Sequence, residues 1–468
     1  MSHATQGRLC HQVESLRRQF VQAPELPLGG VFDAQEVERA LEEENVQSCD
    51  CVYTPLVTLR MLLSQVMDAD PSLRQAVSRL LAERAAAGQP GISANTGAYS
   101  QARQRLPEAV LRRLTRRVGD DLLLQAPVRW LWHGRDVKIV DGTTVSMPDT
   151  PENQAAYPQS KSQKPGLGFP LARLLVVFSL AVGTVLDSAL GRYRGKETGE
   201  TALFRALHDN LCEGDIVLAD RYFCSFFEIA LLQQRGVDVV LRLHQRRSAD
   251  FRRGQRLGPN DHVVVWDKPS RPQWMDEATY RQLPDTLTLR EMRFQVTPPG
   301  FRTDTIVVVT TLLDPEEVSV LDLADLYRAR WQAELDLRAL KTTMQMDILR
   351  SKTPAMVRKE MWAHLLAYNL IRTVMAQAAQ QHDLPPREIS FKGTVQTLAA
   401  FAPYALLARA GQLQEFSSRV LAAIAQHRVG DRPDRSEPRA SKRRHDTYPL
   451  LMVPRRQAQA LLRKGCYG

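Results

Sequence analysis

Three carboxylates carry the chemistry that this sequence suggests. Asp141 follows the apolar-rich stretch "VKIV", Asp220 follows "IVLA", and Glu334 lies in a helical segment further along the chain. A polar residue just beyond an apolar strand can lie at the ligand-binding edge of an α/β sheet, although a lone aspartate there is more often a turn residue. Three convergent carboxylates would repel one another unless a cation lay between them, and Mg²⁺ or Mn²⁺ prefers such oxygen ligands. Two such ions would support in-line displacement at phosphorus.

The segment "LYRARWQAELDLRALKTT" (326–343) predicts one helix with a narrow polar stripe. At 100° per residue, four polar side chains fall within about 60° of one another: Tyr327, Arg330, Glu334 and Lys341. Apolar residues occupy most of the remaining circumference. Surface salt bridges from Glu334 to Arg330 and to Arg338, both at i,i+4 spacing, would explain Glu334 without catalysis. They would not explain why Tyr327 and Lys341 share its stripe.

The elements that would position these residues form an α/β pattern. The middle of the chain predicts a strand (136–147), a hairpin (173–193), a helix (199–214), a strand (215–220), a helix (225–236) and a strand (237–244). Up to about Gln125 the chain is helical, with two short helices divided at Pro107. Strand-like pieces at 262–267, 287–296 and 304–314 follow, and the region from Pro354 to about Gln426 is helical.

Charge and hydropathy point to a nucleic-acid partner and away from a membrane. The chain has 468 residues and a net charge of +10, and 51 of its 62 basic residues are arginines. Arginine binds phosphate through two parallel hydrogen bonds, although arginine-rich codon usage would produce the same excess. The most apolar run, 174–186, is too short to span a bilayer and predicts buried strands. The N-terminus shows no signal peptide, so a cytoplasmic location is predicted.

The polar stripe also carries a family signature. The sequence resembles the DDE transposases of the insertion sequence 4 family, which are marked by Tyr, two residues, Arg, three residues, Glu, six residues and Lys. Here the signature is complete in "YRARWQAELDLRALK". Two blocks are similar to those around the family's catalytic aspartates, "DGTTVSMPDTPENQAAYP" and "LADRYFCSFF", and "NTGAYSQARQRLP" is similar to a recurrent N-terminal block. The resemblance spans about residues 95 to 343.

The resemblance implies a particular architecture. It predicts an α/β fold whose catalytic core (131–350) is RNase H-like and contains a β-rich insertion (245–303). An N-terminal helical DNA-binding domain (1–130) would precede the core. A C-terminal helical region (351–427) and a basic linker and tail (428–468) would follow it.

The resemblance also assigns roles to single residues. Asp141, Asp220 and Glu334 would be the catalytic residues and the ligands of two Mg²⁺ ions, for which Mn²⁺ can substitute. Contacts to DNA are expected from two groups, the signature residues Tyr327, Arg330 and Lys341 and the further candidates Arg221, Trp266, Arg103 and Arg105. Trp266, or alternatively Trp274, would receive a flipped base. Each further candidate has a structural alternative: a salt bridge for Arg221, core packing for the tryptophans, and a solvated basic face for the arginines.

The function implied is that of a DNA transposase. It would bind terminal inverted repeats in double-stranded DNA, cleave the ends of an insertion sequence and join them to target DNA. Its partners would be that DNA and a second copy of the chain in a synaptic complex, at the nucleoid and not at a membrane. Two alternatives are a metal-dependent nuclease with the same RNase H-like fold and a sequence-specific DNA-binding protein whose catalytic site has decayed.

Overall fold

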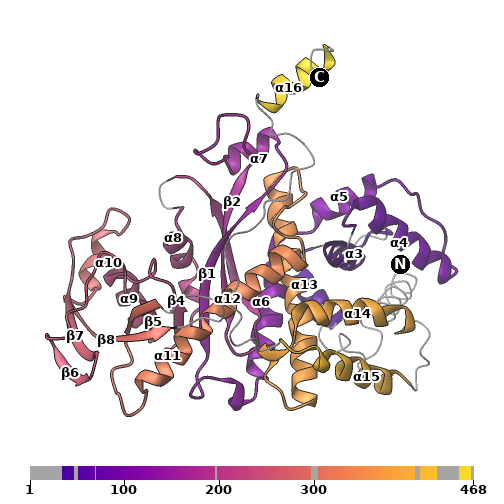
Figure 1. Ribbon diagram of the computed structural model, residues 1–468. Helices are drawn as coiled ribbons and strands as arrows, with labels where there is room; N and C mark the ends of the chain where they lie inside the picture. Colours follow the sequence, from indigo (N-terminus) through magenta and orange to yellow (C-terminus); the bar gives the residue numbers. More distant parts are fainter. Residues whose placement is uncertain are drawn as a thin grey trace.

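The protein is built on one mixed sheet with helices on both faces. The computed structural model describes residues 34–46, 51–68, 70–195, 198–296, 304–405, 412–429 and 453–464. Within these residues nine strands follow the order β3-β2-β1-β4-β5-β9-β8-β7-β6 (Figure 1). The predicted α/β class is confirmed.

The first five strands form the half of the sheet that carries the two candidate aspartates. They are β1 (Val137–Ser146), β2 (Leu171–Ser179), β3 (Val185–Arg192), β4 (Ile216–Ala219) and β5 (Asp238–Arg242). β1, β2 and β3 pair antiparallel, whereas β1, β4 and β5 run parallel. Besides the short α7 (Pro151–Ala156), which follows β1, two helices lie between the parallel strands along the chain, α8 (Glu200–Arg205) and α9 (Phe226–Gln233). The predicted series of three strands, helix, strand, helix and strand is therefore confirmed.

Each face of this half-sheet has its own hydrophobic core. Successive side chains of a strand point to opposite faces, and Ile139 and Val140 accordingly belong to different clusters. The helices α6 (Glu108–Leu124) and α13 (Pro354–Gln381) cover one face. The other face is covered by α8 and α9. Strands buried on both sides explain the nearly continuous apolar runs in the sequence.

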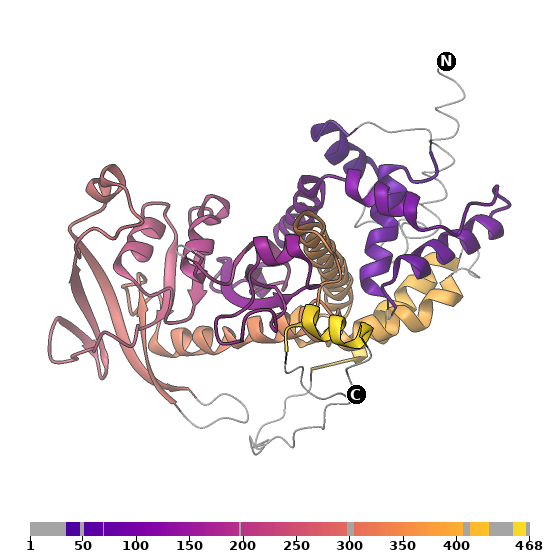
Figure 2. The same cartoon turned by 90° about the horizontal axis from the view of Figure 1, so that it is seen from above.

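The strands of the predicted insertion extend the same sheet. They are β6 (Gln255–Gly258), β7 (Asp261–Asp267) and β8 (Thr286–Val296), with α10 (Glu277–Gln282) between the last two. β8 pairs antiparallel with β9 (Asp304–Thr310), which pairs antiparallel with β5. Figures 1 and 2 place β6, β7 and β8 at one end of the molecule and the N-terminal helices at the other.

Helices form the region before the sheet, as predicted. They are α2 (Ala34–Glu43), α3 (Pro55–Met67), α4 (Leu73–Ala86), α5 (Gly97–Arg105) and α6. Pro107 is the N-cap residue of α6, which confirms the division predicted there. α3 and α6 both pack against α13, so this region shares a core with the sheet.

The segment that carries the polar stripe is not one regular helix, so that prediction is wrong. It comprises α11 (Val320–Ala329), α12 (Trp331–Arg338) and a π-helical turn, η3 (Ala339–Thr343). The break lies at Arg330, whose N–H bonds to the carbonyl three residues earlier, at Tyr327, instead of four. Short irregular turns of this kind often mark functional positions in helices.

The remaining elements are mostly helical. They are η1 (Val128–Trp130), α7 (Pro151–Ala156), η2 (His208–Asn210), η4 (Pro386–Glu388), α14 (Phe391–Ala405), α15 (Leu413–Gln426) and α16 (Arg455–Arg463). Most of the predicted basic linker lies outside the described residues. In the described part of the chain, no helix is both long and apolar enough to cross a membrane.

Candidate active site

The two aspartates leave neighbouring parallel strands at the same level. The last residue pair between β1 and β4 is Val140 with Ala219, and Asp141 and Asp220 follow these residues directly. Asp220 lies just past the end of β4, as predicted. β1 instead continues to Ser146 through its pairing with β2, so Asp141 lies inside a strand and only its pairing with β4 has ended. Both carboxylates therefore face the opening beyond β4.

Helix α12 brings Glu334 to the same opening. The three acids line one open pocket of about 520 Å³. They share it with three cationic residues, Arg330, Arg338 and Lys341. The structure thus brings together acids from β1, the end of β4 and a helix more than a hundred residues later in the chain.

Backbone amides orient both aspartates. The N–H of Gly142 donates to Asp141 Oδ1 at 2.8 Å, and the N–H of Tyr222 donates to Asp220 Oδ1 at 2.8 Å. A carboxylate fixed through one oxygen presents the other in a defined direction. Asp141 Oδ2 lies 3.9 Å from Arg330 Nη1, beyond hydrogen-bond distance.

Arg330 lies between two of the acids. Besides its contact with Asp141, its Nη2 lies 3.4 Å from Glu334 Oε1. Burial, together with the negative charges of Asp220 and Glu334, raises the pKa of the Asp141 carboxyl to about 6. The Gly142 N–H and Arg330 act in the opposite direction. The pocket therefore concentrates negative charge that Arg330 only partly offsets.

The remaining signature residues support the pocket in different ways. Lys341 Nζ donates to the hydroxyl of Thr143 on β1 at 3.2 Å, which ties η3 to the strand of Asp141. Tyr327 is buried and does not line the pocket. Its ring centroid lies 6.0 Å from the Arg330 guanidinium, and burial raises the pKa of its phenol. Tyr327 is thus placed to support Arg330 from behind.

The sequence did not indicate a fourth acid beside this pocket. Glu200, the first residue of α8, packs so closely against Gly142 that a Cβ there would lie 2.7–2.8 Å from its side-chain atoms. Burial raises the pKa of the Glu200 carboxyl, Arg173 lowers it, and the charge of Asp220 raises it. Glu200 is far from every motif in the sequence, and only Gly142 hints at a close approach.

Comparison with known proteins agrees with this arrangement of residues. The family model described as "Transposase DDE domain" matches residues 132–370, which include all three acids. The chain belongs to this family. It is 27% identical over 452 residues to the transposase InsG for insertion sequence element IS4 of Escherichia coli K12, covering 94% of this chain and 96% of that protein. The resemblance to insertion sequence 4 transposases is thus confirmed, and the protein is a DNA transposase, a polynucleotidyl transferase.

Two further proteins match less of the chain or match it more weakly. The putative transposase InsZ of E. coli K12 is 29% identical over 140 residues, covering 30% of this chain and 46% of that protein. A solved structure, a piggyBac transposase synaptic complex with hairpin DNA, aligns with 87% of this chain and 84% of that chain at 10% identity. Its TM-score of 0.41 does not by itself establish a common fold.

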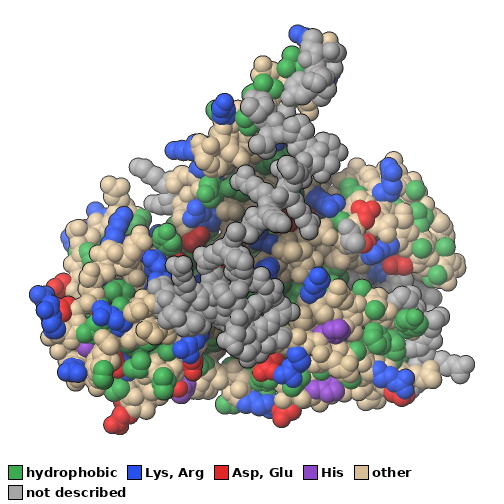
Figure 3. All heavy atoms as spheres, in the orientation of Figure 1, with side chains coloured by type: hydrophobic (Ala, Val, Ile, Leu, Met, Phe, Trp, Pro, Cys, Tyr) green, Lys and Arg blue, Asp and Glu red, His purple; other side chains and the backbone are tan. Residues whose placement is uncertain are grey.

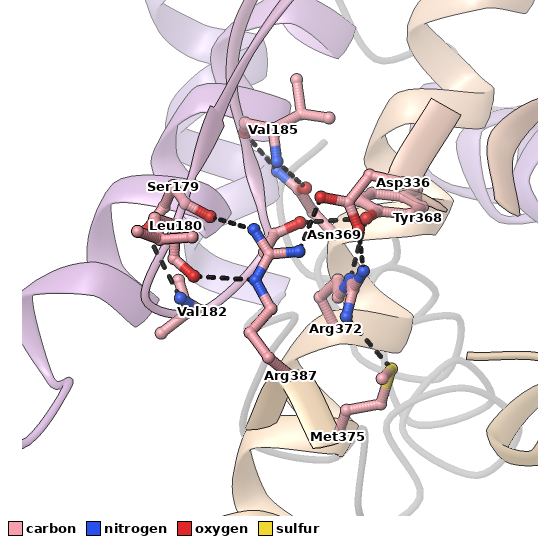
Figure 4. Close-up of polar contacts among 11 residues, drawn as sticks. Ser179, Leu180, Val182, Val185, Asp336, Tyr368, Asn369, Arg372, Met375 and Arg387 are labelled. Carbon is pink, nitrogen blue, oxygen red and sulfur yellow. Dashed lines mark hydrogen bonds and ion pairs between the residues drawn. The ribbon is translucent and has the colours of Figure 1, made fainter. Parts of the chain in front are cut away.

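In this transposase, a buried ion-pair cluster anchors the helix of Glu334 (Figure 4). Asp336 lies two residues further along α12 and is fully buried. Its carboxylate accepts hydrogen bonds from Arg372 of α13 and from Arg387 of η4, the latter at 2.6 Å. Arg387 also donates to the carbonyl of Leu180 at 2.7 Å, at the end of β2. The cluster therefore ties α12 to α13 and to the sheet.

The same cluster holds the turn between β2 and β3. Tyr368 donates its hydroxyl hydrogen to the carbonyl of Gly183 at 3.0 Å and accepts from Arg372. Asn369 exchanges two hydrogen bonds with the backbone of Val185, at 2.7 and 2.8 Å. The backbone of Gly183 has a φ of +80°, in the turn of the hairpin predicted over 173–193. A Cβ at Gly183 would lie 2.8 Å from the Arg372 guanidinium.

The further DNA-binding candidates of the transposase do not line the pocket of the three acids. Arg221 Nη1 lies 3.5 Å from Gln245 Oε1, without an acidic partner in the described structure. Trp266 is buried, donates to Glu291 at 3.0 Å, and has Arg247 stacked 3.8 Å from its ring centroid. In this conformation Trp266 is a packing residue, because a base could stack on it only after Arg247 moved.

The alternative tryptophan and the N-terminal arginines are placed differently. Trp274 is partly exposed and has Arg205 stacked 3.7 Å from its ring centroid. Arg105 is exposed, whereas Arg103 is buried, so a solvated basic face is wrong for Arg103. Figure 3 shows Lys and Arg side chains scattered over one face of the molecule among hydrophobic and acidic ones.

The donor chemistry of the pocket fits a divalent cation. Carboxylate oxygens are the ligands that Mg²⁺ and Mn²⁺ prefer. Burial raises the pKa of Asp141 most, and the nearby charges of Asp220 and Glu334, which a cation would offset, also raise it. In the described part of the structure no three acidic, histidine or cysteine side chains are arranged to hold an ion, and Arg330 contacts two of the acids instead.

Proposed function

We propose that this transposase cleaves the DNA at the ends of an insertion sequence and transfers those ends to target DNA at the pocket of Asp141, Asp220 and Glu334. The observation that carries the proposal is the convergence of these acids with Arg330 and Lys341 in one open pocket. Acids and cations side by side suit a substrate that carries negative phosphates and needs a metal-activated nucleophile.

Each residue of the pocket has a role in this proposal. The three acids would hold Mg²⁺, or Mn²⁺ in its place, as two ions that activate water or a 3′-hydroxyl. Lys341, fixed on Thr143, would contact a phosphate oxygen next to the cleaved bond. Arg330 would exchange its contacts with the acids for contacts with DNA, while buried Tyr327 supports its position.

The architecture supports an RNase H-like reading of the core. The strand order β3-β2-β1-β4-β5, with the acids on β1, after β4 and on a later helix, supports the RNase H-like core that the family resemblance predicts. We extend the proposal to a β-rich insertion, an N-terminal helical region that contacts DNA and a homodimer in the synaptic complex, acting in the cytoplasm at the nucleoid. Arg221, Arg105 and, after Arg247 moves, Trp266 remain proposed DNA contacts.

Strand transfer tests the proposal directly. Purified full-length protein is incubated with Mn²⁺ and a DNA duplex that carries the end of the element, and cleaved and joined products are measured. Wild type is expected to form both, and Glu334→Gln neither, with unchanged DNA affinity. The matched control Asp325→Asn removes one exposed acid of the preceding helix, and its activity is expected to equal that of wild type. Full joining by Glu334→Gln would overturn the assignment.

The alternative functions make different predictions in the same assay. A nuclease would cleave without joining, and a decayed DNA-binding protein would do neither. The complete set of three acids, Arg330 and Lys341 around one pocket favours an active transposase over a decayed one.

A further inference from the structure

A second pocket lies between the N-terminal helices and the chain that follows the catalytic helix. Its volume is about 460 Å³, and its walls come from α3, α5, residues 344–356 and α13. It shares no lining residue with the catalytic pocket. A pocket of several hundred Å³ has the size of a small-molecule or nucleotide site.

Arg103 of α5 lines this pocket as a buried cation without an acidic partner. It is 9% exposed, its buried Nε has no hydrogen-bond partner within the described residues, and its guanidinium lies 5.8 Å from the ring centroid of Tyr99. The other buried arginines of the described chain, Arg60, Arg290 and Arg372, each pair with an acid. Burying an unpaired charge is expensive, so Arg103 is a site that an anion from outside the chain would stabilise.

The acids near Arg103 are already engaged. Asp68 forms an ion pair with Arg79 at 2.5 Å. The Glu360 carboxylate accepts the backbone N–H groups of Arg350 and Ser351, each at 2.8 Å. These acids line the pocket, yet neither contacts Arg103.

Further cations make the pocket electropositive. The side chains of Arg350 and Lys352 line it from exposed positions and have no acidic partner in the described structure. Burial, together with the charge of Arg350, lowers the pKa of His364 to about 3, so this lining imidazole is neutral. Burial likewise lowers the pKa of the neighbouring Lys359 ammonium, and Arg103 adds to that effect. A positive field in a partly enclosed site favours an anion.

Part of the remaining wall is apolar and suits a base, and neutral polar side chains such as Gln65, Ser100 and Gln345 line the rest. Leu62 and Val66 of α3 face the pocket, with Met344, Ile348 and Met356 from the other side. Ile348 is 61% exposed, so its apolar side chain is accessible to a ligand in the pocket. Apolar walls with a few charged groups at one end are typical of sites for amphipathic ligands.

The two pockets follow each other along the chain. Lys341 and Thr342 line the catalytic pocket, and Met344 and Gln345 line the second one. The π-helical turn η3 joins the two pockets, and neighbouring residues along it are only a few ångströms apart. A DNA strand bound at Lys341 therefore has a short distance to cover before it reaches the second pocket. Successive phosphates of one DNA strand are spaced on this same scale.

We propose that this second pocket binds one phosphate-bearing nucleotide, with its phosphate on Arg103, Arg350 and Lys352 and its base against the apolar wall. The source that the position favours is the DNA strand leaving the catalytic pocket; a free nucleotide offers the same chemistry. The choice of DNA as source rests on the proposed function. The site itself rests on Arg103 and its surroundings.

The salt dependence of DNA binding tests the proposal without any metal or catalysis. Affinity of the full chain for an end-bearing duplex is measured between about 50 and 200 mM salt. Loss of one phosphate contact in Arg103→Gln is expected to lower the slope of log affinity against log salt by about 0.9, or about 0.7 if the strand is single. Arg103→Lys, which keeps the charge, is expected to retain most of the slope. The matched control Arg74→Gln removes an exposed arginine outside the pocket and is expected to keep the wild-type slope.

A second arm separates the two sources. Binding of inorganic phosphate and of deoxyadenosine monophosphate is measured by calorimetry on wild type and Arg103→Gln. Arg103-dependent binding of free nucleotide with an unchanged DNA slope would keep the site and remove DNA as its source. No dependence on Arg103 in either arm would overturn the proposal.

A folding defect has its own control. Thermal unfolding is recorded for every variant. If Arg103→Gln does not fold, Lys352→Gln, at an exposed position of the pocket, replaces it in the salt-dependence measurement. Lys352→Gln is expected to lower the same slope, and a wild-type slope in this variant would count against the site. The binding assay measures no cleavage. A negative result in it would therefore leave the proposed role of Glu334 in strand transfer standing, and a negative strand-transfer result would leave the binding site standing.

Discussion

Glu334 and Asp336 lie two residues apart on α12 and occupy opposite environments. The Glu334 side chain is 41% exposed in the pocket of the three acids, whereas the Asp336 side chain is fully buried. A separation of two residues is about 200° around a helix, so one face presents the acid and the other fixes the helix. The ion pairs of Asp336 therefore determine where Glu334 can reach.

Removal of the Asp336 charge is expected to damage both stability and activity. Asp336→Asn leaves Arg372 and Arg387 buried without their acid, and breaking a buried ion pair in this way costs about 3–5 kcal/mol. Urea unfolding is the measurement. In the folded fraction, kcat for cleavage is expected to fall while DNA affinity is retained, because Glu334 shifts and Lys341 does not. The control Asp325→Asn, at an exposed acid, is expected to change stability by no more than about 0.5 kcal/mol; equal losses in both variants would contradict this role.

Two glycines with positive φ allow the cost of backbone strain to be distinguished from the cost of displacing the arginines around Asp336. Gly183 and Gly88 both have positive φ, +80° and +63°, but only a Cβ at Gly183 would meet neighbouring atoms, at 2.8 Å from the Arg372 guanidinium. Gly88→Ala is expected to lose about 1 kcal/mol through strain alone. Gly183→Ala adds displacement of the arginines and is expected to lose about 2 kcal/mol more. Thermal and urea unfolding measure the difference, and equal losses would show that the arginines adapt freely.

The sequence predicted most of the sheet because its strands are buried on both faces and read as apolar runs. It also predicted the convergence of Asp141, Asp220 and Glu334, through strand ends and a complete signature. It could not reveal the break at Arg330, because helix periodicity reads continuously across one irregular hydrogen bond. Charged residues read as exposed in a single sequence, so buried Asp336 gave no signal. The partners of Asp336, such as Arg387, lie far along the chain, so no local pattern in the sequence links them to it.

The contact between Gly142 and Glu200 predicts a double-mutant coupling beside Asp141. Gly142→Ala places a Cβ 2.7–2.8 Å from the end of the Glu200 side chain, and overpacking of this kind costs about 1–3 kcal/mol. Glu200→Ala removes the obstacle. The double variant is therefore expected to match Glu200→Ala alone in stability, which denaturant titration of all four proteins tests. Additive losses would mean that the strand itself, not Glu200, rejects the extra carbon.

His364 gives the protein without DNA a predictable sensitivity to acid. Burial, aided by Arg350, lowers its pKa from 6.5 to about 3, so the unfolded chain binds a proton that the folded chain refuses. Above pH 6.5 the neutral His364 costs the folded protein no stability. As the pH drops from 6.5 toward 3, the free energy of unfolding falls by about 1.4 kcal/mol per pH unit, because only the unfolded chain takes up the proton. His364→Gln is expected to flatten the decline measured by urea unfolding between pH 7 and pH 4.5. His382→Gln, at an exposed histidine beyond the end of α13, is expected to leave it unchanged. If both variants followed the wild-type curve, the acid sensitivity would arise from other groups.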